Sequence, residues 1–310
     1  MTPSRMTLRR EIFVRELSKT CSKSRRPSLL RLTDRLIAMI AACMLTSCAA
    51  LLRDSPAVEF TAATYNVHYM QRGLPGLIHT IKGIDADVVA LQEVLSTGGQ
   101  PASAQIAGSL GYHHVASMPY VNYGSAQWVL AILSRHPIVA RDEIRLGNSR
   151  RALRAVVNIN GRPVEFITMH LMPLAGNTGG MQSVRQRGQS RRAEIADLLT
   201  WLGEAKRPRF LLGDFNMLRG TMGFYDLDEY DLVSDVYSDA DGGWPPTNSD
   251  TFPLPDATRK KIGERLPIWL VPRSITLDYI FVSDAVKVLD TDVIKSEASD
   301  HWPLVGRFRL

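Results

Sequence analysis

Short apolar segments that alternate with turn residues fill residues 57–310, and this pattern constrains the fold more than any other feature. Two apolar runs on either side of Asn160-Gly161 are typical of a β-hairpin. The clearest helical spacing of apolar side chains lies in residues 184–202. No internal repeat and no interior linker divides these segments. The pattern therefore predicts one α/β domain with many short strands.

Polar residues recur at the points where the apolar segments end. Strand ends on one edge of a sheet allow a rigid scaffold to gather side chains that are distant in sequence. Each of these residues alone reads as an ordinary turn or strand end, but their number favours a shared site. The residues are Asn66, Glu93, His170, Asp214, Asn216, Asp278, Asp300 and His301.

The segments around these residues resemble the endonuclease/exonuclease/phosphatase superfamily, which includes pancreatic deoxyribonuclease, abasic-site endonucleases, neutral sphingomyelinases and inositol-polyphosphate phosphatases. Their order and spacing match over about residues 60–310, with no substitution in the core set. The resemblance implies a two-sheet, four-layer α/β sandwich of the deoxyribonuclease-I type with mostly antiparallel strands. The segments are Thr64-Tyr65-Asn66-Val67-His68, Ala90-Leu91-Gln92-Glu93-Val94, Thr168-Met169-His170-Leu171, Leu212-Gly213-Asp214-Phe215-Asn216, Leu277-Asp278-Tyr279-Ile280 and Ser299-Asp300-His301.

The same resemblance implies metal-dependent hydrolysis of a phosphoester. That reaction needs an in-line water and neutralisation of charge on the non-bridging oxygens. Glu93 is a hard oxygen ligand suited to Mg²⁺, and by resemblance Asn66 and Asp300 hold or orient the metal shell, with Mn²⁺ as the alternative ion. All three cysteines lie before residue 50, so residues 57–310 have no thiolate metal site.

Catalytic roles for the remaining residues also follow from the resemblance. Asp214 would align or deprotonate the attacking water, and Asn216 would hold that water or a phosphate oxygen. His170 and His301 would donate to phosphate oxygens. Asp278 would orient His301 and raise its pKa. The general base, Asp214 or His301, and the number of metal ions stay open.

The segment before the domain indicates export. Residues 36–45 form an apolar run that follows a basic stretch. This run is too short to span a bilayer but is typical of the core of a signal peptide. Cys48 follows Leu-Thr-Ser and resembles the lipidated cysteine of a bacterial lipobox. We expect a signal peptide over residues 1–48, a tether over 49–56 and the catalytic domain over 57–310. A short buried helix is the alternative reading of the apolar run.

The net charge of the chain, +6, comes from this leader. Residues 1–47 contain ten Lys/Arg and three Asp/Glu, a net of +7, which leaves −1 for residues 48–310. The body therefore has no bulk attraction for a polyanion. This balance disfavours a nuclease for extracellular DNA or RNA. We expect instead an enzyme that acts on lipid headgroups or other small phosphoesters. We further expect it to be a monomer, anchored through Cys48 to an inner or outer bacterial membrane and facing the periplasm.

Other features leave alternatives open. A catalytically inactive binding protein is a weaker reading, because binding alone does not need Asp214, Asp278 and His301 together. His68, two residues after Asn66, would face the same side if the strand continued, so it lines the cleft or has a structural role.

The loops between the strands select the substrate in this superfamily. In the loop region of about residues 239–274, aromatic residues suit a lipid interface or a packed loop equally. These are Trp244, Phe252 and Trp269.

Overall fold

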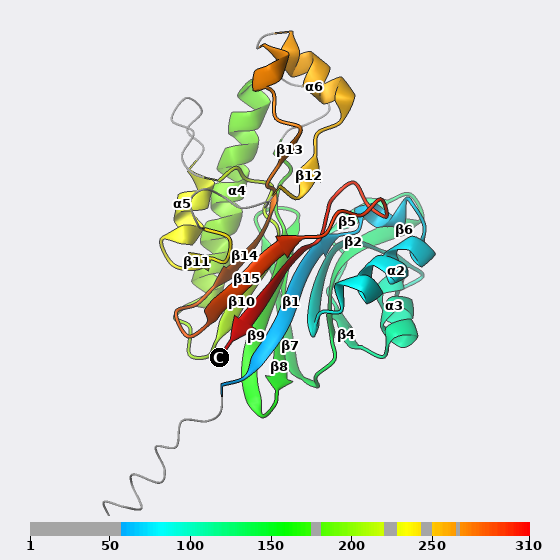
Figure 1. Cartoon of the computed structure of the whole chain (residues 1–310), viewed down its shortest axis with the longest axis vertical. Helices are drawn as coiled ribbons and strands as arrows, with labels where there is room; N and C mark the ends of the chain where they lie inside the picture. The colour runs from blue at the N-terminus through cyan, green and yellow to red at the C-terminus, as the bar shows by residue number, and fades with distance from the viewer. Residues whose placement is uncertain (1–56, 175–180, 220–227, 243–249, 265–266) are drawn as a thin grey trace, which may run out of the picture. The chain divides into compact units, whose positions relative to one another are not determined.

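Two large β-sheets form the centre of the unit that begins at residue 57 (Figure 1). The expected signal peptide, the tether and Cys48 lie outside the described residues, as does Trp244. The computed structural model describes residues 57–174, 181–219, 228–242, 250–264 and 267–310.

The first sheet has the strand order β15-β16-β1-β2-β6-β4, with β3 paired to β2 and β5 paired to β6. Its strands are β1 (Glu59–Asn66), β2 (Val88–Thr97), β3 (Gln100–Pro101), β4 (His113–Ala116), β5 (Val121–Tyr123), β6 (Ala126–Ser134), β15 (Lys287–Val293) and β16 (Leu304–Arg309). The second sheet has the order β11-β14-β10-β9-β8-β7. Its strands are β7 (Ile138–Leu146), β8 (Arg150–Ile159), β9 (Arg162–His170), β10 (Arg209–Asp214), β11 (Ser238–Asp239) and β14 (Asp278–Val282). A small sheet pairs β12 (Phe252–Pro253) with β13 (Ser274–Ile275).

Most neighbouring strands run antiparallel, and β1–β2 and β9–β10 are parallel pairs. The hairpin between β8 and β9 turns at Asn160 and Gly161, as its sequence predicts. Their φ angles are 49° and 87°, the positive values that a two-residue type I′ turn requires. The predicted α/β sandwich with mostly antiparallel strands is therefore confirmed.

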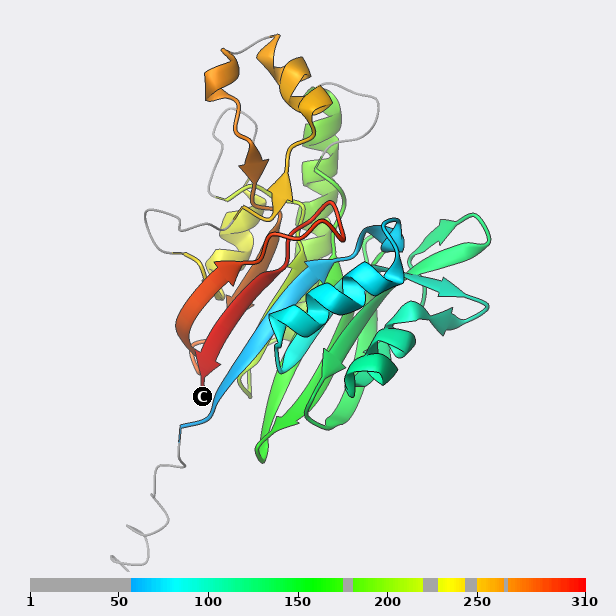
Figure 2. The same cartoon turned by 45° about the vertical axis from the view of Figure 1, so that its right-hand side comes forward.

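Helices cover the outer faces of the two large sheets (Figure 2). Leu77 and Ile81 of α2, with Ile106 of α3, pack on the first sheet. Ile195 and Leu198 of α4 pack on the second sheet, and α5 lies beside α4. The described part of the chain has no helix long and apolar enough to cross a membrane. The helices are α2 (Leu74–Ile84), α3 (Ala102–Leu110), α4 (Met181–Leu202), α5 (Glu229–Ser234) and α6 (Asp256–Gly263), with short 3₁₀ helices η1 (His68–Met70) and η2 (Ile268–Leu270).

The space between the sheets changes from apolar to polar along the strands. Aromatic and aliphatic side chains such as Phe60 and Phe210 fill one end. Gln92 then bridges the sheets, because its Nε2 donates to Thr64 Oγ1 at 3.1 Å and to Thr168 Oγ1 at 2.9 Å. Since side chains on a strand alternate with a period of two, the next inward positions extend these rows beyond the apolar core. The candidate site occupies them.

Candidate active site

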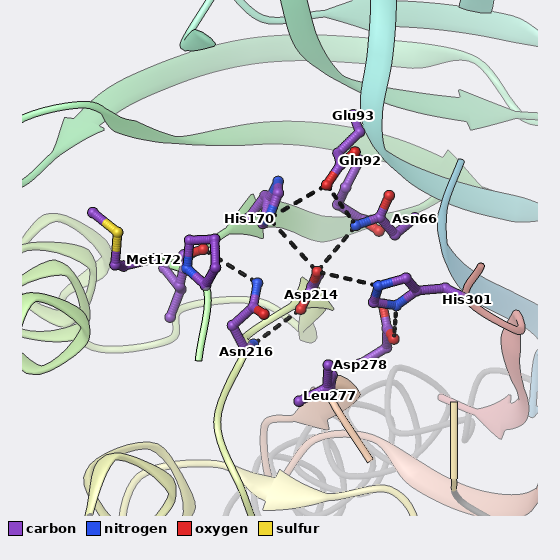
Figure 3. A network of polar contacts seen from close by, with 12 residues as sticks. Asn66, Gln92, Glu93, His170, Met172, Asp214, Asn216, Leu277, Asp278 and His301 are labelled. Atoms are coloured by element: carbon purple, nitrogen blue, oxygen red, sulfur yellow. Dashed lines mark hydrogen bonds and ion pairs between the residues drawn. The ribbon is translucent and has the colours of Figure 1, made fainter. Parts of the chain in front are cut away.

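Strand ends of both sheets bring the polar residues together (Figure 3). Asp214, at the end of β10, pairs with His170 of β9 on one side and with Asp278 of β14 on the other. These three residues therefore form one row across the second sheet. Asn66, at the end of β1, lies opposite in the first sheet, and its Nδ2 donates to Asp214 Oδ2 at 3.0 Å. The expected gathering of distant strand ends is thus present.

Glu93 reaches the group through an irregularity in β2. Regular alternation would turn it outward with Leu91, toward the layer of α2. Instead, the register with β6 shifts between Leu91 and Val94, and Glu93 adopts a φ of 55°. This bulge turns the carboxylate inward, where Glu93 Oε1 accepts a hydrogen bond from Asn66 Nδ2 at 3.2 Å. Asn66 therefore joins a carboxylate of each sheet.

His301 and Asp278 form a buried pair. His301 Nδ1 donates to Asp278 Oδ2 at 2.7 Å, and His301 Nε2 lies 3.9 Å from Asp214 Oδ2. Burial alone would lower the pKa of His301, but the Asp278 carboxylate outweighs it and raises that pKa to about 10. The imidazole is therefore charged at neutral pH, with Nε2 as a donor on the side of Asp214.

Tyr120 is a site residue that the sequence analysis did not single out. Its hydroxyl oxygen accepts the backbone N–H of Glu93 at 3.1 Å and lies 3.0 Å from His170 Nδ1. His170 Nε2 faces two carboxylate oxygens, Asp214 Oδ2 at 3.6 Å and Glu93 Oε1 at 3.8 Å. The proton of neutral His170 is therefore assigned to Nε2, and Nδ1 accepts from the Tyr120 hydroxyl. Burial, followed by the charge of Arg150, holds the pKa of His170 well below its ordinary value, which favours this neutral form.

Arg150, at the start of β8, is a second residue without a sequence-based role. It is buried, and its Nε and Nη1 atoms have no hydrogen-bond partner among the described residues. Its guanidinium lies 5.8 Å from the centre of the Tyr120 ring. Buried donors without hydrogen-bond partners are costly, so this position is suited to a phosphate group, whose oxygens would accept from them. No motif around Arg150-Arg151 distinguishes it from a turn.

Buried carboxylate oxygens make the site fit a divalent cation. Glu93 Oε2 has no hydrogen-bond partner among the described residues, and burial raises the pKa of Glu93 to about 7, so a cation there would stabilise the carboxylate. Ligand atoms of Asp214, Asp278 and His301 also lie within 4.8 Å of one another. Their shared hydrogen bond between His301 and Asp278 explains that proximity without a metal ion. Glu93 is therefore the stronger metal-ligand candidate.

The other predicted site residues lie around this centre. Asp300 is 32% exposed, and its Oδ1 lies 3.3 Å from His68 Nδ1. β1 ends at Asn66 and does not continue to His68, which opens the short helix η1 with a φ of 44°. Asn216 donates from its backbone N–H to Asp214 Oδ1 at 3.0 Å, while its side-chain Nδ2 donates to Leu171 O at 3.3 Å. Asn216 thus holds Asp214 and the segment after β9 in place.

An aromatic wall, made of Tyr69, Tyr123 and Trp128, borders His170. The Trp128 ring stacks on His170 at 6.4 Å and on Tyr69 at 5.4 Å between ring centres. Tyr123 lies 4.8 Å from Tyr69 and is exposed to solvent. The wall therefore runs from the buried site to the surface.

Comparisons with known proteins identify the family and the fold. Residues 63–301 match the model of the Endonuclease/Exonuclease/phosphatase family. No curated protein sequence matches significantly. Solved structures share the fold at low identity. One, an endonuclease/exonuclease/phosphatase from Beutenbergia cavernae, is 21% identical with a TM-score of 0.64, covering 81% of this chain and 72% of its own.

Two further solved structures are enzymes or catalytic domains of known name. ANGEL2, described as a 2′,3′-cyclic phosphatase, is 17% identical with a TM-score of 0.54 and covers 82% of this chain and 96% of its own. The human Nocturnin catalytic domain, which has a bound sulfate anion, is 18% identical with a TM-score of 0.56 and covers 81% and 96%. At such identities the likeness is one of fold.

Proposed function

Since the chain belongs to the endonuclease/exonuclease/phosphatase family, it is a phosphoester hydrolase, and we propose that its metal ion is Mg²⁺ and its substrate a lipid headgroup or another small phosphoester. The observation that carries this proposal is that one buried site contains both an acceptor and donors without hydrogen-bond partners. Among the described residues, Glu93 Oε2 has no hydrogen-bond partner, and neither do Nε and Nη1 of the Arg150 guanidinium. A metal ion and a phosphate group together would satisfy both.

Donors and one acceptor converge on the place where the phosphate would react. Asn66 Nδ2, His170 Nε2 and His301 Nε2 all lie within 3.9 Å of Asp214 Oδ2. Asp214 is the only carboxylate in that set, so it would align the attacking water and accept its proton. The two histidines would donate to phosphate oxygens, and charged His301 would stabilise the charge that develops there.

The remaining residues hold the reacting groups. Glu93, with Asn66 and Asp300 beside it, would bind the divalent cation. When bound, that cation would supply positive charge to the phosphate oxygens. Arg150 would add a fixed positive charge on the side of Tyr120 and His170. Tyr120 would keep the Nε2 proton of His170 directed at the substrate.

Removal of the metal ion tests the proposal. We expect hydrolysis of a soluble bis-aryl phosphodiester to fall by at least about tenfold in excess chelator, because positive charge at the phosphate supplies several kcal/mol. Mg²⁺ should restore the rate, with Mn²⁺ as a second ion. Ca²⁺ and Zn²⁺ serve as comparison ions. Full activity in excess chelator would refute a metal-dependent reaction.

The aromatic wall favours a second candidate, a nuclease. Tyr123 is exposed and Tyr69 and Trp128 are partly exposed, and aromatic rings beside a phosphoester site suit stacking of nucleobases, at about 1–3 kcal/mol per base. The net charge of −1 over residues 48–310 argues against strong polyanion binding. A panel of plasmid DNA, single-stranded RNA and phospholipid vesicles, each with Mg²⁺ and with chelator, separates the candidates. Faster turnover of nucleic acid would replace the lipid-headgroup proposal.

We also propose that the enzyme is a monomer exported to the bacterial envelope and anchored through a lipidated Cys48. Several acyl chains on one cysteine would give stable attachment, whereas one chain binds reversibly. A Cys48→Ser variant expressed in a bacterium is expected to leave membranes that are washed at high salt, which weakens electrostatic contacts. It should keep its activity on the soluble diester. If the variant stays with washed membranes as firmly as the parent, the lipobox interpretation fails.

A further inference from the structure

A projecting segment joins the active site to an exposed apolar tip. This segment, called the arm, consists of β12, α6, η2 and β13. Both views show α6 beyond the ends of the two large sheets (Figures 1 and 2). Neither α6 nor η2 contains a buried residue. These two helices therefore contribute little to the core. The arm has two ends, a root beside β12 and β13 and a tip at η2.

The root of the arm contacts catalytic candidates. Thr251 Oγ1 accepts the backbone N–H of Asp278 at 3.1 Å, and Thr251 O accepts the N–H of Trp302 at 2.6 Å. The ring of Phe252 lies 4.8 Å from that of His301. The arm is thus fixed to the segments that carry the buried His301–Asp278 pair.

The tip exposes three consecutive large apolar side chains. Ile268, Trp269 and Leu270 of η2 are 54%, 79% and 53% exposed. Single exposed apolar residues are common, but a contiguous set indicates a contact surface. η2 lies against the end of α6, where a Cβ at Gly263 would be 3.1 Å from Ile268 Cδ1. The tip therefore packs against its own helix.

Basic residues flank this apolar tip in the sequence. Residues 256–273 contain five Lys/Arg and two Asp/Glu, a net of +3, although residues 48–310 together have a net charge of −1. Lys260 and Lys261 of α6 and Arg273 after η2 are exposed. Exposed basic residues thus lie on both sides of Trp269 in the sequence.

We propose that the arm docks the enzyme on an anionic lipid surface. Ile268, Trp269 and Leu270 enter the boundary between headgroups and acyl chains, where tryptophan is favoured. The flanking lysines and arginines contact lipid phosphates and attract the arm to a negatively charged surface. This combination of an apolar tip and a basic rim complements an anionic membrane better than an acidic or a neutral protein surface.

Docking would also orient the active site. Because the root holds Asp278 and contacts His301, a docked arm keeps the site at a set distance from the lipid layer. Phosphoesters of that layer then meet the site at high effective concentration. Docking itself does not depend on which ester is cleaved, whereas its consequence for substrate choice rests on the function proposed above.

Vesicle binding tests the docking surface. The chain from residue 48 onward, carrying Cys48→Ser, is first checked for cooperative unfolding by circular dichroism and then sedimented with phosphatidylglycerol or phosphatidylcholine vesicles. We expect binding to phosphatidylglycerol that weakens with salt. A variant with Trp269→Ser and Leu270→Ser should bind at least about tenfold less, since it loses the burial of two large apolar side chains. A variant with Lys260→Glu and Lys261→Glu should bind phosphatidylglycerol vesicles more weakly, with no change toward phosphatidylcholine vesicles.

Matched controls separate docking from folding and from chemistry. Val236→Ser removes an apolar side chain that is 56% exposed outside the arm, and it should leave vesicle binding unchanged. All variants should hydrolyse the soluble diester as the parent does. A parent that binds vesicles but lacks that activity would refute the proposed function and leave docking intact.

Several results would overturn docking. These are no binding by the parent, equal binding to both lipids, equal binding by the Trp269 and Leu270 variant, or a concentration-dependent dimer that this variant abolishes. The last result would assign the tip to a second copy of the chain.

Discussion

Asp214→Asn is expected to lower kcat/KM by at least about a hundredfold, the usual loss when a general acid–base group is removed. Asp214 Oδ1 accepts the N–H of Asn216, while Oδ2 accepts Asn66 Nδ2 and faces the two histidine Nε2 atoms. Asparagine has the same shape but no charge. The amide of the variant would also place an NH₂ group at the position of Oδ1 or Oδ2, where the parent carboxylate accepts a hydrogen bond. An amide does not accept a proton from water at neutral pH.

The control for this substitution is a buried carboxylate at the opposite end of the β9–β10 strand pair. Glu165 accepts a hydrogen bond from Arg209 Nε at 2.7 Å and lies within β9. Glu165→Gln should lower the Tm, because it leaves Arg209 partly unpaired, but it should keep kcat/KM near the parent value. Initial rates and thermal melting of both variants decide the matter. An Asp214→Asn enzyme with near-parent kcat/KM would remove Asp214 from the chemistry.

His301→Ala is expected to cost at least about a hundredfold in kcat/KM, because it removes a charged donor from the site. Asp278→Asn should also be damaging, since His301 loses the carboxylate that orients it at 2.7 Å. Asp278 acts through His301 in this interpretation. In the His301→Ala background, Asp278→Asn should therefore have little further effect, as residues that act as a unit are strongly non-additive.

A double-mutant cycle measures this coupling. Rates of the parent, the two single variants and the double variant give the interaction free energy directly. His113→Ala, a change at an exposed histidine of β4, is the control in each background and should be silent. Additive losses for Asp278 and His301 would mean that Asp278 has a separate role. A His301→Ala enzyme near the parent rate would place Ser299-Asp300-His301 outside the reaction.

The sequence alone determined the sandwich and most of the candidate site. Alternation with a period of two puts Phe210 and Leu212 in the core and Asp214 on the same inward side. The same rule places Asn66 and His170, because each ends a strand whose earlier inward residues are apolar or hydroxylated. The turn at Asn160-Gly161 was equally predictable, since few residues adopt positive φ readily. Local physical rules suffice for such features.

Only the tertiary structure decided the features that depend on contacts between distant segments. Alternation would have turned Glu93 outward, and only the register shift against β6 turns it inward. Tyr120 and Arg150 acquire roles because β8, β9 and the loop before β5 meet, which no local pattern records. Trp269 could have been packed or exposed on its sequence, since burial is a property of the neighbours and not of the residue. A one-dimensional pattern specifies which face a side chain prefers, whereas the folded chain determines what that face meets.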